Sequence, residues 1–244
     1  MDVHSATFAG RLTLIKEEDF MTNGSGYLFA FLLLPLLGFL GCTRASAVSS
    51  ALPNPETDAA LASAKGQQTA VLAGGCFWGI QLVFQHVKGV ASATSGYSGG
   101  SARTADYETV SSGSSGHAEA VKIVYDPSQV TYGELLRVFF SVAHDPTELD
   151  RQGPDTGSQY RSAIFYAGDE QKRIAEAYIA QLNKAKAFPQ PIVTQVVPLD
   201  AFYPAEGYHQ NYAVQHPENP YIRINDLPKL VQLRQLLPEL YRAD

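Results

Sequence analysis

The chain has 244 residues and a formal net charge of −6 at pH 7, and 45% of its residues are hydrophobic, 11% aromatic and 17% charged. These values are typical of a globular protein and exclude a wholly disordered, collagen-like or coiled-coil chain. Its lysines and arginines form no cluster, so the sequence does not favour nucleic acid as a partner. The two cysteines, Cys42 and Cys76, cannot by themselves build a disulfide framework or a four-ligand zinc site.

Residues 1–42 are interpreted as a targeting segment, because residues 20–43 carry no charged side chain. The apolar stretch at residues 27–40 is shorter than the about 20 residues of a comfortable spanning helix. It ends in FLGC at residues 39–42, which resembles the lipobox of bacterial lipoproteins, where the cysteine is lipidated. A cleaved signal, an uncleaved anchor and a buried core helix are the alternatives, and Met21 is an alternative start. We expect a membrane-anchored or periplasmic protein of the cell envelope, with a cytoplasmic or organellar location as the alternative.

Residues 43–67 are rich in Ala, Ser and Pro and contain no aromatic residue, which predicts a flexible linker. Residues 68–244 are sufficient for one domain with a sizeable core. At its start, residues 69–73 predict a strand and Gly74-Gly75 a tight turn. Residues 77–88 then show helical spacing, with Gly89 as the expected C-terminal cap.

Further along, residues 117–125 alternate in polarity, so that Glu119 shares one strand face with Val121, Ile123 and Tyr125. Thr131 and Glu134 form a capping box before apolar residues at helical spacing. Residues 160–166 and 192–197 predict strands on either side of a helix at 170–186 that Asp169 opens. We therefore expect an α+β fold, a two-layer sandwich in which a ferredoxin-like core combines a mixed sheet with flanking helices.

Cys76 follows two glycines where the first predicted strand meets the first helix. The free N–H groups and the dipole of a helix N-terminus favour an anion, so we expect a stabilised thiolate that acts as a nucleophile. A small buried hydrophobic residue is the alternative, because free cysteines are often buried.

Other side chains have the chemistry to assist this thiol. Apolar neighbours on the strand face would raise the pKa of Glu119 and make it a proton donor, whereas the alternative is a solvated carboxylate near a strand end. Tyr107 and Tyr160 lie in segments rich in Gly, Ser and Asp, where a phenol either donates to a substrate oxygen or only packs. The spacing of His209 and His216 fits no common metal site, so we expect no metal.

Several segments resemble motifs of the peptide methionine sulfoxide reductase A family. The signature is GGCFWG at residues 74–79, followed by SGYSGG at 95–100 and GHAEAV at 116–121. The remaining motifs follow in family order. They are HDP at residues 144–146, the stretch from RQG to QYRS between 151 and 162, and YPAE and YHQ between 203 and 210. The resemblance covers about residues 68–220.

This resemblance implies a repair enzyme that reduces the S epimer of methionine sulfoxide, free or in proteins, without a cofactor. Cys76 would attack the sulfoxide sulfur while Glu119 protonates the oxygen, which leaves a sulfenic acid on the cysteine. By the same resemblance, Tyr107 and Tyr160 would bind the sulfoxide oxygen, and Phe77 and Trp78 would surround the methyl group. Asp155 would handle the incoming thiol.

The sequence departs from the family pattern after the YHQ motif. Many family members carry resolving cysteines there, but residues 211–244 contain none. The sulfenic acid would therefore be reduced by an external thiol, such as thioredoxin, and we expect a monomer. Two other functions stay open: a cysteine hydrolase or acyltransferase that uses His117 or His209, and a lipid-tethered binding module.

Overall fold

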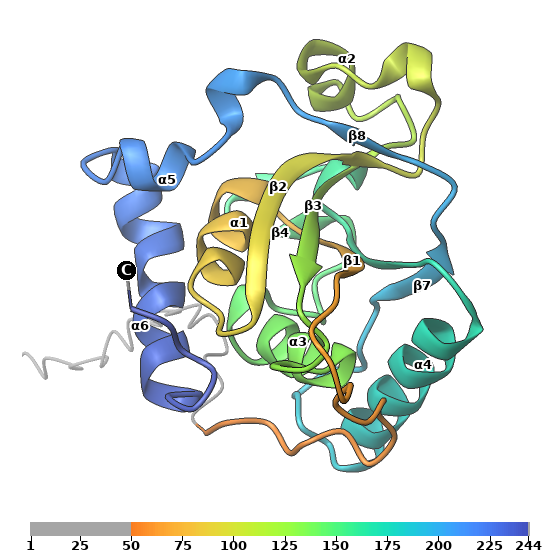
Figure 1. The fold of residues 1–244 in the computed structure, drawn as a ribbon. Helices are drawn as coiled ribbons and strands as arrows, with labels where there is room; N and C mark the ends of the chain where they lie inside the picture. The colour runs from red at the N-terminus through yellow and green to blue at the C-terminus, as the bar shows by residue number, and fades with distance from the viewer. Residues whose placement is uncertain (1–49, 244) are drawn as a thin grey trace, which may run out of the picture. The chain divides into compact units, whose positions relative to one another are not determined.

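The structure is a computed structural model that describes residues 50–243 (Figure 1). The predicted targeting segment at residues 1–42, its cysteine, and residues 43–49 of the predicted linker lie outside the described residues. Among the helices of residues 50–243, none has the length and apolar character that a membrane crossing requires.

A six-stranded sheet forms the centre, with the strand order β7-β6-β1-β3-β2-β8. Only the β6–β7 pair is parallel, and the other neighbours are antiparallel. The strands are β1 (Gln68–Gly74), β2 (Val90–Ser98), β3 (Ala118–Tyr125), β6 (Ser162–Tyr166), β7 (Gln195–Pro198) and β8 (Phe202–Pro204). A separate hairpin pairs β4 (Arg151–Gln152) with β5 (Asp155–Thr156).

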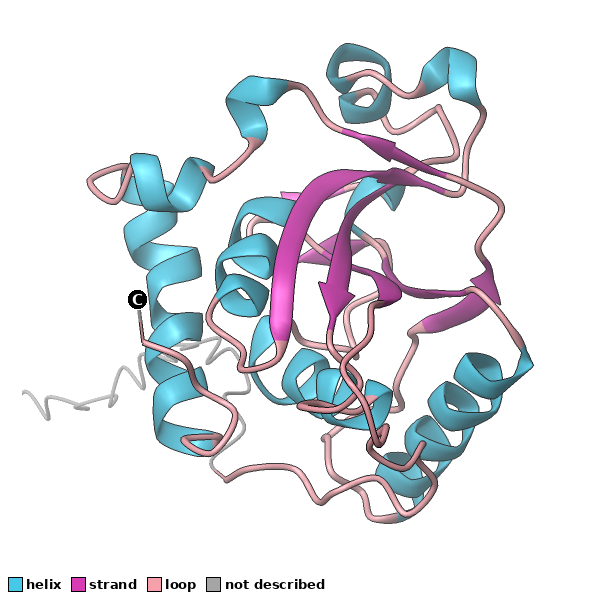
Figure 2. Ribbon diagram, in the orientation of Figure 1, coloured by secondary structure: helices cyan, strands magenta, loops and turns pink. Residues whose placement is uncertain are grey.

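Helices surround this sheet, and Figure 2 shows how β2 and β3 curve between them. The α-helices are α1 (Phe77–Gln85), α2 (Tyr107–Ser111), α3 (Tyr132–Val138), α4 (Asp169–Lys184), α5 (Tyr212–Gln215) and α6 (Leu227–Leu236). Short 3-10 turns are η1 (Ala102–Thr104), η3 (Ser158–Tyr160) and η4 (Gly207–His209), and short π-helical turns are η2 (Phe139–Ala143) and η5 (Ile222–Asp226).

The main core lies on the sheet face that carries Leu72, Val121 and Ile164, where side chains of α1, α3, α4 and α6 are buried against it. A smaller core on the other face contains Phe165, with Phe202 packed against it. The mixed sheet with flanking helices confirms the predicted α+β fold.

Local signals explain several element boundaries. The Thr131 hydroxyl accepts a hydrogen bond from the N–H of Glu134, and the Glu134 carboxylate accepts one from the N–H of Thr131, so the predicted capping box is present. Two predicted caps are wrong. The first helix ends at Gln85 with His86 as its C-cap, and Gly168 is the N-cap of α4, so Asp169 is its first residue.

The prediction of a flexible linker is wrong for the part of it nearest the domain. Leu52 is only 4% exposed and belongs to the main core. The Tyr178 hydroxyl donates to the Pro53 carbonyl at 2.8 Å. Asp58 accepts hydrogen bonds from the Thr131 hydroxyl and the Gly133 N–H. This segment is therefore fixed to the domain at several points.

Candidate active site

Cys76 is the N-cap residue of α1, in the connection that follows β1. The turn needs glycine, because Gly75 has a φ of +95° and an added Cβ would lie 2.5 Å from Cγ of Gln152. The backbone N–H of Trp78, in the first helical turn, lowers the pKa of the Cys76 thiol. The strand, glycine turn and helix therefore place one helix N–H group, that of Trp78, against the sulfur.

The predicted stabilised thiolate is wrong for this structure, because burial dominates the thiol. Cys76 is 9% exposed, and burial raises its pKa well above the ordinary value. The charges of Glu119 and Asp226 raise the pKa further, while the Trp78 N–H and Lys229 oppose them. The thiol is therefore neutral at pH 7 and must lose its proton as it reacts.

Glu119 lies close to this turn because β3 pairs with β1. Leu72 is opposite Val121, so Glu119 lies level with the end of β1. The side chain is 2% exposed, and its Oε2 accepts a hydrogen bond from the N–H of Phe77 at 3.0 Å. Burial raises the pKa of Glu119 to about 8, although the Phe77 N–H opposes this rise. At pH 7 about 90% of the carboxyl groups are protonated with such a pKa.

Tyr107 and Tyr160 lie near both groups. Burial raises the pKa of the Tyr107 phenol, and the charges of Glu119 and Cys76 raise it further. Burial and the charge of Glu119 likewise raise the pKa of Tyr160. Both phenols keep their protons at neutral pH and can donate hydrogen bonds to an oxygen.

Glu206 holds Tyr107 in place, a role that the sequence motif alone did not reveal. One carboxylate oxygen accepts the Tyr107 N–H at 2.9 Å, and the other accepts the Tyr97 hydroxyl at 2.8 Å. Burial raises the pKa of Glu206, but these hydrogen bonds and other contacts outweigh burial, so the pKa lies below its ordinary value. The YPAE segment therefore fixes the start of α2 against β2.

An aromatic wall is built around His209. Its ring centroid lies 5.1 Å from that of Phe77 and 4.4 Å from that of Tyr107. Its Nδ1 accepts a hydrogen bond from the indole N–H of Trp78 at 3.3 Å. The Trp78 ring is also stacked on Tyr212, with ring centroids 3.9 Å apart. Sequence reasoning considered His209 only as a metal ligand or base; its place in a motif was the available signal.

Asp155 accepts a hydrogen bond from the hydroxyl of Tyr221. The Tyr221 ring is edge-on to Trp78, with centroids 6.1 Å apart. Tyr221 lies in the segment where no cysteine is present, and the sequence offered no motif that marks it. The C-terminal part of the chain thus contributes directly to the surroundings of Cys76.

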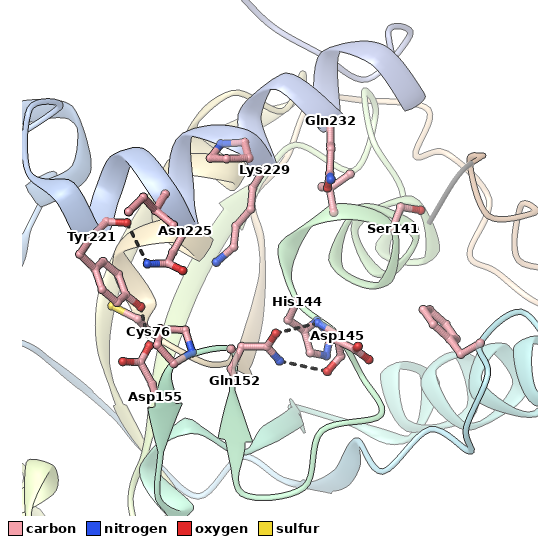
Figure 3. A pocket seen from close by; sticks show the side chains of 16 residues that line it. Cys76, Ser141, His144, Asp145, Gln152, Asp155, Tyr221, Asn225, Lys229 and Gln232 are labelled. Atoms are coloured by element: carbon pink, nitrogen blue, oxygen red, sulfur yellow. Dashed lines mark hydrogen bonds between the residues drawn. The ribbon is translucent and has the colours of Figure 1, made fainter. Parts of the chain in front are cut away.

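A cavity of about 250 Å³ opens beside Cys76 (Figure 3). Its wall includes Gln152 and Asp155 on one side, and Tyr221 and Lys229 on the other. The lining does not include the five remaining predicted site residues, which are Phe77, Trp78, Tyr107, Glu119 and Tyr160. Cys76 therefore has the acid, phenols and aromatic wall near it and also faces a separate cavity.

The histidines do not form a dyad with this thiol. The ring of His117 accepts the Gly100 N–H through Nδ1 and contacts the Ser101 carbonyl through Nε2, and His209 is engaged with Trp78. Neither ring is hydrogen-bonded to Cys76, which removes the support for a hydrolase. Within residues 50–243, no group of three or more His, Cys, Asp or Glu side chains is arranged to hold a metal ion.

Comparisons with known proteins agree with this geometry. The sequence model described as "Peptide methionine sulfoxide reductase" matches residues 68–239. "Peptide methionine sulfoxide reductase MsrA 2" of Mesorhizobium japonicum is 60% identical over 73% of this chain and 92% of its own length. The protein with the same name from Synechocystis is 50% identical over 84% of this chain and 96% of its own length.

Solved structures are similar as well. Methionine sulfoxide reductase A of Corynebacterium diphtheriae is 37% identical, with a TM-score of 0.56 over 69% of this chain and 85% of its own. Reduced Mxr1 from Saccharomyces cerevisiae is 31% identical, with a TM-score of 0.57 over 67% of this chain and 92% of its own. The chain belongs to the peptide methionine sulfoxide reductase family.

Proposed function

We propose that this chain reduces methionine sulfoxide to methionine, with Cys76 as nucleophile and Glu119 as acid. One observation carries the proposal: a buried carboxyl group, protonated up to about pH 8, is hydrogen-bonded to the residue that follows the thiol. A sulfoxide oxygen departs from sulfur only when it receives a proton. A neutral carboxylic acid beside a cysteine is the pair that this reaction needs.

In the reaction, Cys76 Sγ forms a bond to the sulfoxide sulfur while Glu119 protonates the oxygen. The thiol proton replaces the one that Glu119 gives up. The S–O bond of the substrate and the transient bond between the two sulfurs then break, and the hydroxyl group is transferred to Cys76. The cysteine is thereby oxidised by two electrons to a sulfenic acid, and the methionine sulfur is reduced by the same two electrons. The phenols of Tyr107 and Tyr160 donate hydrogen bonds to the oxygen as its charge grows.

The same arrangement supports selection of the S epimer. The phenols and Glu119 offer donors to the oxygen, whereas Phe77 and Trp78 offer an apolar wall to the methyl group. Exchange of the two substituents on sulfur would leave the oxygen against aromatic rings without a donor, which carries a desolvation penalty.

An external thiol then returns Cys76 to its reduced form. Residues 43–244 contain no cysteine besides Cys76, so this part of the chain cannot form an internal disulfide. A thiolate attacks the sulfenic acid, the S–O bond breaks, water leaves, and a second thiol releases Cys76 from the mixed disulfide. We propose thioredoxin or a comparable thiol as the donor and Asp155 as a residue that meets it, since Asp155 lines the cavity with Cys76.

Turnover of the separate R and S epimers of a blocked methionine sulfoxide, with dithiothreitol as reductant, tests this function. We expect consumption of the S epimer alone, its loss in Cys76→Ser, and its retention in the matched control Cys42→Ser. Failure of the folded protein to consume either epimer would refute the function. Loss of activity in Cys42→Ser would contradict the proposal that Cys76 is the one cysteine that turnover with dithiothreitol needs.

We also propose that residues 1–42 direct the protein to the cell envelope and that Cys42 carries a lipid. The support is the uncharged apolar run and the FLGC sequence at residues 39–42. Metabolic labelling with a fatty acid should mark the wild-type chain and not Cys42→Ser. Labelling of neither would refute lipidation.

Two structural proposals accompany the function. The strands β1, β2, β3 and β6 lie in the order β6-β1-β3-β2 with antiparallel neighbours, and α1 and α3 lie in the connections before β2 and before β6. This arrangement supports a ferredoxin-like core. We also propose that the protein is a monomer, and light scattering of the purified protein tests it.

A further inference from the structure

Lys229 and Asp226 form an ion pair over the first turn of the helix that Cys76 caps. Lys229 Nζ lies 3.2 Å from Asp226 Oδ1. An added Cβ on Gly79 would lie 2.1 Å from that oxygen and 2.7 Å from the ammonium nitrogen. Because Gly79 follows Cys76 by only three residues, the pair lies on the same helical turn as the thiol.

The cavity provides a second link between the ammonium group and the sulfur. Both Cys76 and Lys229 line it. In Figure 3 the Lys229 side chain extends from α6 toward the side of the cavity where Cys76 and Gln152 lie. Lys229 is the one lysine or arginine among the residues of this cavity wall. Its ammonium group is therefore the positive charge that the wall places near the thiol.

Stability alone does not account for the pair. The Asp226 side chain is fully buried, and its Oδ2 has no hydrogen-bond partner among the described residues. A buried carboxylate with one satisfied oxygen is costly, and buried ion pairs are often no more stabilising than apolar residues of the same volume. Burial raises the pKa of Asp226, and Lys229 opposes that rise.

We propose that Lys229 and Asp226 are positioning residues that set the charge of Cys76. The Lys229 ammonium stabilises the thiolate as the thiol attacks the sulfoxide, and again when the thiolate leaves the mixed disulfide. Asp226 holds the ammonium over Gly79 and limits its effect. This inference rests on the proposed role of Cys76 as the nucleophile.

The two charges act on the thiol with opposite signs. Lys229 lowers the pKa of Cys76 and Asp226 raises it. The other titratable groups around the thiol stay the same when either is replaced; they are Glu119, Asp145, Asp155, Tyr107, Tyr160, Tyr221 and His144. Replacement of Lys229 and of Asp226 should therefore move the thiol in opposite directions.

The rate of Cys76 alkylation by iodoacetamide, a neutral reagent, measures this over a range of pH. We expect Lys229→Met to slow alkylation at pH 8 and Asp226→Asn to accelerate it. If the pKa moves by about one, the thiolate fraction changes about tenfold and the rate about threefold, because a more basic thiolate is also a better nucleophile. Lys229→Arg should restore the wild-type rate.

The control is Lys184→Met, which removes the same charge from an exposed position in the last turn of α4. It should alkylate at the wild-type rate. A purely structural pair would loosen the helix turn in both variants and accelerate alkylation in both, which would overturn the proposal. Equal rates in the wild type, Lys229→Met and Asp226→Asn would overturn it as well.

The double variant Asp226→Asn/Lys229→Met covers the case in which Lys229→Met fails to fold, because it leaves no unpaired buried charge. We expect it to alkylate more slowly than Asp226→Asn, because it lacks the ammonium group, and a rate equal to that of Asp226→Asn would refute a role for Lys229. The alkylation uses no sulfoxide. Opposite shifts in alkylation with no sulfoxide consumed by any form would therefore refute the proposed function and leave the charge pair standing.

Discussion

The protonated state of Glu119 predicts an unusual dependence of stability on pH. The pKa of Glu119 is about 8 in the folded protein against an ordinary value of 4.5. Between these values the unfolded chain has released the proton and the folded protein has kept it. The folded state then binds one proton more than the unfolded state, so stability falls as pH rises through this window.

The magnitude follows from the width of that window. Each pH unit costs about 1.4 kcal/mol, so the group removes up to about 5 kcal/mol of unfolding free energy by pH 8. At pH 7 the cost is about 3 kcal/mol by the same relation. Glu119→Gln places a neutral isostere at this position, and its amide oxygen can still accept the Phe77 N–H. We expect the variant to be more stable than the wild type, by an amount that grows from pH 5 to pH 8.

Urea unfolding of both proteins between pH 4 and pH 9 measures the difference. All other titrating groups are common to the two proteins, so their contributions largely cancel. The curves should converge near pH 4 and diverge above it. The same variant should lose about 10² to 10⁴ in the rate of sulfoxide reduction, because it has no proton to give. Parallel stability curves across this range would refute a protonated Glu119, whatever the loss of activity.

Three further substitutions test the surroundings of the site. His209→Phe keeps an aromatic ring but leaves the indole N–H of Trp78 without an acceptor; we expect a higher KM for methionine sulfoxide and a loss of about 1–3 kcal/mol in urea unfolding. Tyr221→Phe removes the hydroxyl that Asp155 accepts; steady-state assays should show slower turnover, and urea unfolding a loss of about 1 kcal/mol. Leu52→Ala should lower the unfolding free energy by about 2–4 kcal/mol, because this side chain is 4% exposed; an unchanged value would show that its segment is a free linker.

The burial of Glu119 was predictable because it depends on local periodicity. Alternation along residues 117–125 places the carboxyl group on the face that carries Val121 and Ile123, and both of these are fully buried. Burial is the largest cause of the raised pKa. A strand pattern read from the sequence therefore carried the essential information about the surroundings of this carboxyl group.

The state of the Cys76 thiol was not predictable in the same way. The local signal, a helix N-terminus, is present and acts in the expected direction through the Trp78 N–H. It is outweighed by burial and by the charges of Glu119 and Asp226, which come from β3 and from the C-terminal segment. Tertiary packing therefore determines whether the pKa of the Cys76 thiol is raised or lowered, and the sequence around residue 76 does not contain this information.

The segment before β1 shows a different limit. Its composition over residues 43–67 is that of a flexible chain, yet Leu52 enters the core and Asp58 caps the start of α3. The average composition of a segment does not show that two of its side chains are placed to contact the domain. One buried leucine and one carboxylate that satisfies a free helix N–H are enough to fix a segment that is otherwise polar.

The C-terminal segment connects these limits to the function. Where the family pattern often has resolving cysteines, this chain has none, and the sequence alone could state only that absence. In the structure the same segment supplies Tyr221, which binds Asp155, and the Asp226–Lys229 pair, which lies over the helix that carries Cys76. A chain that depends on an outside thiol must present its oxidised cysteine to that thiol and must also stabilise the thiolate that leaves. The charges that the C-terminal segment supplies can stabilise this leaving thiolate without a resolving cysteine.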